Sequence, residues 1–309
     1  MTPQHDYSLG AAFVRGRYVP IGEAAIPLTD WGFLRSDAAY DVVTVWNGSF
    51  FRLDAHLERF AHSCARFRLN AGLSPAQISA VLAQCVLLSG LDSAYVEMVV
   101  TRGQPPWGSR DPRLATNQFY AFAVPYVWLA NAEQRARGLH LVVSEVQRIP
   151  ATSVDPRAKN YHWNDLTMGL LGALDAGADT VVLSDAEGNA VEGPGFNLFC
   201  VNAQGVLVTP QQGVLEGVTR RTVIDIAQAL GLPLQLRALP AAELRSAREV
   251  FVTSSAGGVL PVTRVDGVPV GAGVPGPLTR QIEHTYWDWH RDPRYSLAVG
   301  AVDLATLPA

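Results

Sequence analysis

Alternation of apolar and polar positions predicts strands through the first 125 residues. The strongest signal is Asn47-Gly48 between two apolar-rich runs, because Asn-Gly is the favoured two-residue turn of a hairpin. The expected strands are a short pair within Phe13–Val19, the hairpin arms Tyr40–Trp46 and Ser49–Leu53, and the runs Tyr95–Thr101 and Phe119–Val124.

Two stretches between these strands repeat apolar residues at helical spacing. The first is Ala55–Leu69, for which we expect Asp54 to act as the N-cap. The second is Pro75–Leu88, with proline at its start and Gly90 beyond its end, a pattern typical of helix boundaries. The first region is therefore predicted to be a mixed domain of helices and strands.

The rest of the chain alternates short strands with glycine-rich turns and a few helices. The expected strands are Leu139–Val146, Thr180–Leu183, Phe196–Val201, Val206–Thr209 and Glu249–Thr253, and the expected helices are Leu166–Ala176, Thr219–Leu230 and Gly276–His290. Few β-α-β alternations occur, which argues against a doubly wound parallel sheet. The pattern predicts an α+β protein with a small domain 1–125, a connection 126–137 and a larger β-rich domain 138–309.

Composition indicates an ordinary globular protein that acts on small molecules. The 309 residues are 48% hydrophobic and 17% charged, with a formal net charge of -4 and no basic run, which argues against a nucleic-acid or acidic membrane surface. Cys64, Cys85 and Cys200 lack metal-ligand spacing and lie in apolar stretches, which suits buried thiols in a reducing cytosol. Met1–Tyr7 has no signal-peptide pattern, and no apolar run is long enough to span a membrane, so we expect a cytoplasmic location and no metal.

Lys159 is the only lysine among the 309 residues, and every other basic side chain apart from histidine is arginine. Arginine replaces lysine where only a charge is needed, but it cannot form a Schiff base. The neighbours Tyr161 and Trp163 indicate partial burial, which lowers the pKa of an amine. Lys159 is therefore a candidate nucleophile, although one lysine can also persist by chance on a surface loop.

A Schiff-base lysine commonly serves pyridoxal phosphate, which also needs a phosphate site and an acid at the pyridine nitrogen. Candidate phosphate ligands are Arg59, the segment Gly213–Arg221 before a helix, and the hydroxyl-rich Thr253–Gly258. Glu192 is the candidate acid, beside glycines that allow close backbone approach. Each has an alternative: a surface salt bridge for Arg59, a plain helix cap, an ordinary turn, and a solvated turn acid.

Together these motifs resemble the fold-type IV pyridoxal-phosphate enzymes over nearly the whole chain. The (R)-selective amine transaminases are most similar, on the motifs Phe33–Val42, Val45–Gly48, Tyr95–Glu97, Thr101–Gly103, Lys159-Asn160, Trp163, Glu192-Gly193 and Gly217–Arg220. The resemblance implies Lys159 as the Schiff-base lysine and proton carrier, and a cofactor site made by Arg59, Glu192, Asn197, Leu215, Val218, Thr219, Ser254 and Ser255. Departures from the subgroup are Arg35, His162, Asn164, Met168 and Pro194.

The same resemblance implies a substrate site of Arg35, Tyr40, Val42, Tyr95, Glu97, Arg110, Trp163 and Ala256. Glu97 stands where branched-chain enzymes carry an arginine that helps to bind an acid, so an amine without a carboxylate becomes the expected donor. Arg110 lies in a proline-rich loop and is expected to pair with the carboxylate of a keto-acid acceptor, with Arg35 and Arg102 as competitors.

The implied activity is transfer of an amino group from an (R)-amine or D-amino acid to a keto acid such as pyruvate. D-amino-acid and branched-chain aminotransferases, an aminodeoxychorismate-type lyase and a non-catalytic pyridoxal-phosphate-binding protein remain alternatives. The resemblance and the apolar segment Phe119–Leu129 also predict a homodimer.

Overall fold

The structure is a computed structural model that describes residues 6–308, so the expectation for Met1–His5 lies outside the described residues. These residues divide into two compact units. Unit 1 comprises residues 6–127, Ala158–Tyr161 and 290–308, and unit 2 comprises Trp128–Arg157 and His162–Trp289. Lys159 belongs to unit 1 by its contacts, whereas the sequence pattern assigned it to the region 138–309.

Unit 1 is one sheet in the order β16-β4-β3-β5-β6-β1-β2, with neighbouring strands antiparallel. Its strands are β1 (Ala11–Val14), β2 (Arg17–Pro20), β3 (Ala38–Trp46), β4 (Ser49–Phe51), β5 (Ala94–Gln104), β6 (Thr116–Pro125) and β16 (Ser296–Ala298). Its helices are α1 (Trp31–Arg35), α2 (Leu53–Phe67) and α3 (Pro75–Ser89), with 3-10 turns at Ile21–Glu23, Pro112–Leu114, Val299–Ala301 and Leu304–Thr306.

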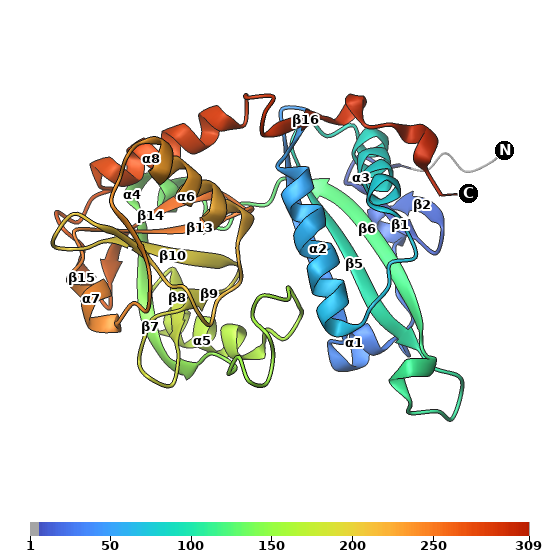
Figure 1. Ribbon diagram of the computed structural model, residues 1–309, viewed down its shortest axis with the longest axis horizontal. Helices are drawn as coiled ribbons and strands as arrows, with labels where there is room; N and C mark the ends of the chain where they lie inside the picture. Colours follow the sequence, from blue (N-terminus) through green and yellow to red (C-terminus); the bar gives the residue numbers. More distant parts are fainter. Residues whose placement is uncertain (1–5, 309) are drawn as a thin grey trace. The chain divides into compact units, whose positions relative to one another are not determined.

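The two-residue period of β3 and β5 separates a packed face from a face that carries polar groups. Val43 and Val96 are paired across the strands and share a core with residues of α2 and α3, which lie along this sheet (Figure 1). Val42 and Glu97 are paired on the other face, together with Tyr40. The register therefore gathers several predicted substrate residues on the sheet face opposite the two helices.

The predicted elements of unit 1 are present, with one incorrect cap. The hairpin turns at Asn47 and Gly48, both with positive φ, as the sequence predicts. The predicted cap Asp54 is wrong: α2 begins at Leu53, and its N-cap is Arg52, with φ 50° and no side-chain cap bond. Asp54 lies in the first helical turn instead, where an acid favourably faces the positive end of the helix dipole.

Unit 2 is a mixed sheet in the order β12-β11-β10-β13-β14-β7-β8, with β15 beside β14 and β9 beside β10. Its strands are β7 (Leu139–Gln147), β8 (Thr180–Ser184), β9 (Glu192–Gly193), β10 (Phe196–Val201), β11 (Leu207–Thr209), β12 (Leu234–Leu236), β13 (Glu249–Ser254), β14 (Gly258–Val265) and β15 (Val268–Pro269). Its helices are α4 (Ala132–Arg137), α5 (Asn164–Asp175), α6 (Val218–Ala229), α7 (Ala241–Arg245) and α8 (Pro277–Trp289). The α+β prediction is confirmed.

The structure alters two expectations, one for the inter-domain connection and one for the apolar segment before it. The polar end of the expected connection is helix α4, capped reciprocally by Asn131 and Gln134. Most of the apolar segment Phe119–Leu129 is strand β6, which pairs with β5 and β1. Its apolar character is explained by the sheet and gives no independent support for a dimer. Among residues 6–308, no helix has the length and hydropathy required to cross a membrane.

Gly193 marks a close approach of β9 to its neighbours. A Cβ at this position would lie 2.1 Å from Phe196 Cζ and 2.3 Å from the carbonyl oxygen of Val181, so the backbone itself would have to move. We expect Gly193→Ala to lower the free energy of unfolding by about 1–3 kcal/mol in urea titrations, through overpacking. The control is Gly172→Ala in α5, where a Cβ meets nothing within 4 Å and alanine favours the helix. Equal stability of the two variants would contradict the packing argument.

Candidate active site

Lys159 is held on an open edge of β3. The short strand β4 pairs only with Val45 and Trp46, so the first half of β3 has no strand on that side. The segment Ala158–Tyr161 lies there instead: Ala39 and Asn160 form a β-bridge, and the Tyr40 backbone N–H donates to the Lys159 carbonyl at 3.2 Å. The position of the lysine backbone is thus set by the sheet.

Helix α2 fixes the other side of this backbone. The Lys159 N–H donates to Ser63 Oγ at 3.0 Å, and the Ser63 hydroxyl donates to the Arg59 carbonyl at 2.8 Å. Ser63 is fully buried, and no motif in the sequence indicated it. The half-buried Lys159 side chain places Nζ 3.2 Å from the Tyr40 hydroxyl and 4.3 Å from the centroid of the Tyr40 ring.

Arg59 belongs to a buried charge cluster rather than to a surface salt bridge. Its Nε and Nη2 donate to the two oxygens of Asp41 at 2.7 and 2.8 Å, and His56 Nδ1 lies 2.8 Å from the same carboxylate. Burial alone would raise the pKa of Asp41, but the Arg59 guanidinium and the His56 ring hold it well below its usual range. Burial lowers the pKa of His56, so the neutral ring donates to Asp41.

Asp41 was not among the predicted site residues, although it lies inside the motif Phe33–Val42. A two-residue strand period could have shown that Asp41 and Tyr40 point to opposite faces. The sequence could not show that α2 supplies an arginine and a histidine to the Asp41 face. The cluster fixes the Arg59 fork, a group that binds carboxylate or phosphate bidentately.

Glu97 is buried, and a tyrosine hydroxyl donates to each of its oxygens. Tyr95 donates to Oε2 at 3.1 Å, and Tyr161 donates to Oε1 through a short bond. Burial raises the pKa of Glu97, against the opposing effect of the two phenols and of Lys159. Tyr161 was noted in the sequence only as an aromatic neighbour, yet its ring stacks on Tyr40 with centroids 4.4 Å apart.

The three arginines that are candidates for binding the acceptor carboxylate differ in their contacts. Arg102 donates to both oxygens of Asp37 and to the carbonyls of Phe67 and Arg68. Arg35 lies 3.5 Å from the centroid of the Trp31 ring. Arg110 is exposed, and within the described residues it has neither an ion pair nor a ring contact.

In unit 2, Glu192 and Asn197 face each other across the β9–β10 pair and bind the backbone of one residue, Leu215, on both sides. Glu192 Oε2 accepts from the Leu215 N–H at 2.9 Å, and Asn197 Nδ2 donates to the Leu215 carbonyl at 2.9 Å. Glu192 is 6% exposed, so it is not a solvated turn acid. The candidate acid thereby also fixes the segment that leads into α6.

Arg148 keeps the Glu192 carboxylate in a charged environment. Its Nε donates to Glu192 Oε1 at 3.1 Å, and its Nη1 donates to Asp165 at 2.6 Å. Burial would lower the pKa of Arg148, but the two carboxylates raise it above the usual value. Arg148 follows the end of β7, and nothing in the local sequence distinguishes it from a surface arginine.

The N-terminus of α6 has the features of an anion site. Val218 begins this helix, Thr219 follows, and the N-cap Gly217 provides no side-chain cap for the first N–H groups. A Cβ at Gly217 would meet Asn197 Oδ1 at 2.0 Å, so only glycine fits there. Thr219 is therefore not the cap that an ordinary helix start would use.

The end of β13 supplies the remaining predicted residues. Ser254 Oγ donates to the Gly195 carbonyl and accepts from the Ala256 N–H, which ties the half-buried Ser255 and Ala256 to the Gly195 turn. Trp163 lies close to Gly195, whose Cβ would be 3.4 Å from the ring. Thr253 Oγ1 is buried, with no hydrogen-bond partner among residues 6–308. The end of β13 therefore lies beside the start of β10, where Asn197 pairs with Thr253.

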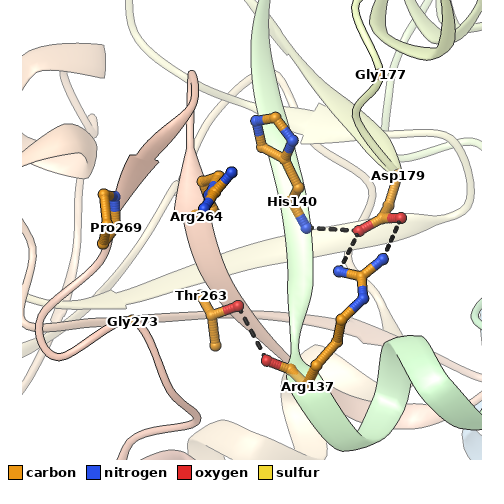
Figure 2. Close-up of a pocket in the computed structure, with 8 residues that line it drawn as sticks. All are labelled: Arg137, His140, Gly177, Asp179, Thr263, Arg264, Pro269 and Gly273. Carbon is orange, nitrogen blue, oxygen red and sulfur yellow. Dashed lines mark hydrogen bonds and ion pairs between the residues drawn. The ribbon is translucent and has the colours of Figure 1, made fainter.

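A separate cavity of about 400 Å³ in unit 2 contains none of the predicted site residues. Figure 2 shows Asp179 bound there to Arg137 and to the His140 backbone N–H. Burial would raise the pKa of Asp179, but these donors, with Gln134, lower it to about 2. The Asp179 carboxylate therefore has a structural role, and this cavity is not the candidate active site.

Comparison with known proteins points to one family. The model of the family "Amino-transferase class IV" matches residues 38–265. The putative branched-chain-amino-acid aminotransferase of Methanocaldococcus jannaschii is 27% identical over 278 residues, 89% of this chain and 95% of that protein. The D-alanine aminotransferase of Bacillus licheniformis is 29% identical over 87% of this chain and 93% of its own. The solved branched-chain aminotransferase of Thermoproteus uzoniensis with norvaline aligns with a TM-score of 0.84 at 28% identity, covering 94% of this chain and 99% of that one.

The buried Asp41 cluster generates a stability prediction. Asp41→Asn leaves the Arg59 charge uncompensated and should lower the free energy of unfolding by about 3–5 kcal/mol at pH 7. Asp41 titrates below the ordinary aspartate value of about 3.9, so its contribution is complete above pH ~4 and is lost as the pH falls through the folded pKa. Urea unfolding is measured at pH 7, 5 and 3. The difference in the free energy of unfolding between Asp41→Asn and the unsubstituted protein should become smaller as the pH falls.

Asp37→Asn is the matched control, because Asp37 also forms a two-point pair with an arginine, Arg102, but is 27% exposed. It should cost about 1 kcal/mol or less. Equal losses at Asp37 and Asp41, or a loss at Asp41 that does not change with pH, would contradict the assignment.

Proposed function

The chain belongs to the class IV aminotransferases, and from this premise we propose that it moves an amino group from an (R)-configured primary amine to a keto acid such as pyruvate. Aminotransferase chemistry and the cofactor, pyridoxal 5'-phosphate, belong to the family. The donor class, its configuration and the acceptor are our proposal. The (R) configuration rests on the motif resemblance.

The residues present fit the cofactor's chemistry. Its phosphate needs an uncapped helix N-terminus, which Val218 and Thr219 of unit 2 would supply together with Ser255. The motif resemblance implies Arg59 as the cation. The orphaned hydroxyl of Thr253, buried at the end of β13, fits a site completed by a polar ligand. Glu192, paired with Arg148, would hold the pyridine nitrogen, and Leu215 would pack on the ring.

When bound, pyridoxal phosphate provides an electron sink that stabilises negative charge on the substrate carbon. Lys159 would hold the cofactor through Nζ, and the same amine would move the proton at the substrate carbon. Tyr40 keeps Nζ in place, because its hydroxyl lies 3.2 Å from the amine. Glu192 favours a protonated pyridine nitrogen by offering a paired, buried carboxylate.

The observation that supports an amine donor is the state of Glu97. It lies opposite Val42 on the face that carries Tyr40, and each of its oxygens already accepts a phenol hydrogen bond. Neither the ionised nor the protonated carboxyl offers the positive charge that a substrate carboxylate needs. A donor with an apolar group at that position does not place an unpaired carboxylate charge beside Glu97.

The second candidate is an amino-acid aminotransferase, favoured by the names of the relatives: branched-chain and D-alanine aminotransferases. A donor panel separates the two proposals. We expect the pyridoxamine half-reaction with (R)-1-phenylethylamine to be faster than with its (S) enantiomer, D-alanine or L-leucine. Pyruvate released from a chorismate-type substrate would identify a lyase, and a cofactor band with no exchange would identify a binding protein.

A homodimer and a cytoplasmic location remain predictions. The first rests on the resemblance, because Phe119–Pro125 belongs to a strand. The second rests on the three buried cysteines, which form no disulfide among themselves.

The lone lysine generates the first functional prediction. Lys159→Ala should abolish the visible absorbance of the bound cofactor and essentially all turnover, because no other ε-amine exists in the chain. Lys159→Arg is the matched control, since it keeps the charge but cannot form the bond. Cofactor trapped by borohydride in either variant, mapped by mass spectrometry to a residue other than the terminal amine, would refute the assignment.

Arg110 generates the second functional prediction. We propose that Arg110 pairs with the acceptor carboxylate, because it is exposed and forms no ion pair among residues 6–308, whereas Arg102 is bound to Asp37. Removing a charged hydrogen-bond partner costs about 1.5–3 kcal/mol, so Arg110→Ala should raise the KM for pyruvate about ten-fold or more. The half-reaction with (R)-1-phenylethylamine should change little.

Arg113→Ala is the control for Arg110, because this arginine lies in the same loop but is bound to Asp111. An unchanged KM in Arg110→Ala would move the role to Arg35 or Arg102. Faster use of the (S)-amine would overturn the proposed donor class.

A further inference from the structure

Tyr161 makes two contacts at once, both within unit 1. Its ring stacks on Tyr40 at a centroid distance of 4.4 Å and an interplanar angle of 14°. Its hydroxyl donates to Glu97 Oε1. Burial, followed by the neighbouring Glu97, raises the pKa of Tyr161 well above its usual value, so the phenol keeps its proton and remains a donor.

Tyr40 is the next member of this chain of contacts. Its hydroxyl lies 3.2 Å from Lys159 Nζ, and Nζ lies 4.3 Å from the Tyr40 ring centroid. Both the oxygen lone pairs and the ring face favour a positive charge on that nitrogen. The orientation of Tyr40 therefore affects the proton affinity of the only lysine amine in the protein.

Tyr161 and Tyr40 belong to different segments, which are joined by backbone contacts between Ala39 and Asn160 and between Tyr40 and Lys159. Tyr40 is in β3, whereas Tyr161 ends the short segment Ala158–Tyr161. Without the bond to Glu97, the Tyr161 ring could rotate away from Tyr40, because a stack alone defines orientation only loosely. Glu97 is itself held in β5 and by Tyr95, so it is a rigid anchor.

We propose that Tyr161 is a positioning residue that, anchored by Glu97, holds the Tyr40 hydroxyl against the Lys159 amine. The proposal rests on the proposed role of Lys159 as the cofactor-binding lysine. It also gives Glu97 a second role, because the same carboxyl that rejects a substrate carboxylate also aligns the tyrosine pair.

Tyr95 provides a matched comparison. It also donates to Glu97, but its ring lies against Phe122 at 6.4 Å and has no stack with Tyr40. Tyr95→Phe and Tyr161→Phe therefore remove the same kind of bond from the same carboxyl. Only Tyr161→Phe removes the bond that anchors the ring stacked on Tyr40, so this variant should affect the orientation of Tyr40 more.

The experiment is a pH titration of the visible absorbance of the cofactor-loaded protein, which reports protonation at the Lys159 nitrogen. The titratable and charged groups on the neighbouring β3, β5 and α2 and on the lysine's own segment are Tyr40, Asp41, Tyr95, Glu97, His56, Arg59 and Tyr161, of which His56 and Glu97 interact electrostatically with Lys159. The unsubstituted protein retains all of these groups and is the reference. Each variant is compared with it at the same ionic strength and over the same pH range.

Loss of a hydrogen bond to a charged group disfavours the protonated form, so Tyr40→Phe should lower the midpoint by about one pH unit, a ten-fold change in proton affinity. Tyr161→Leu should lower the midpoint by a similar amount. The double variant should shift no further than either single variant, because Tyr161 acts through Tyr40. Tyr161→Phe, which keeps the ring, should give a smaller shift in the same direction, and Tyr95→Phe, whose ring is not the one stacked on Tyr40, should shift the midpoint less than Tyr161→Phe.

An unchanged midpoint in Tyr161→Leu, or additive shifts in the double variant, would overturn the proposal. If Tyr161→Leu does not fold, the double variant of Tyr161→Phe and Tyr40→Phe is used instead. A midpoint shift no larger than that of Tyr40→Phe alone supports the proposal, and additive shifts overturn it. Absence of the cofactor band in the unsubstituted protein would instead refute the role of Lys159, and so the failure of the proposed function is distinguishable from the failure of this inference.

Discussion

The pairing of Ala158–Tyr161 with the exposed edge of β3 is the constraint on which the lysine chemistry depends. A strand edge presents unpaired N–H and C=O groups, and here the Tyr40 N–H is satisfied by the Lys159 carbonyl. Ser63 takes the lysine N–H from the side of α2. Because backbone bonds on both sides fix the Cα, the freedom of the amine is limited to its side chain, which Tyr40 then restricts.

A second constraint operates in unit 2, where the backbone of one residue, Leu215, is bound by two candidate site residues. Glu192 and Asn197 bind the N–H and the carbonyl of Leu215, and two residues later Gly217 is the N-cap of α6. The candidate acid and the candidate anion site are therefore coupled through a short, rigid segment. Substitutions at Asn197 would disturb both, although Asn197 itself offers no catalytic chemistry.

Asp41, Glu192 and Glu97 are buried acids, and the partners of each determine what it can do. Asp41 is held ionised by Arg59 and His56, so it acts as a fixed anchor for a cation. Glu192 is paired with Arg148 and remains suited to a positively charged ring nitrogen. Among residues 6–308, the hydrogen-bond donors to Glu97 are two phenols, and burial raises its pKa; in the proposed function it aligns the tyrosine pair and rejects a substrate carboxylate.

The sequence by itself determined the local structure and the chemical types of the site. The hairpin at Asn47-Gly48, the alternation of β3, the unique Lys159, the acid Glu192 and the glycine before α6 follow from turn preference, strand period and amine chemistry, which depend on a few adjacent residues. These features sufficed for the α+β fold and for the candidate lysine, acid and phosphate segment.

The tertiary structure alone decided which partners those groups have. Ser63 is 96 residues from Lys159, Tyr161 is 64 from Glu97, and Arg148 is 44 from Glu192. No local pattern encodes such pairings, because a serine, tyrosine or arginine has the same local preferences whether it faces solvent or a buried acid. The cap of α2 failed for a related reason: Arg52 adopts a left-handed conformation as its N–H donates to the carbonyl of Tyr295, a residue near the other end of the chain. Packing, rather than propensity, set that boundary and those partners.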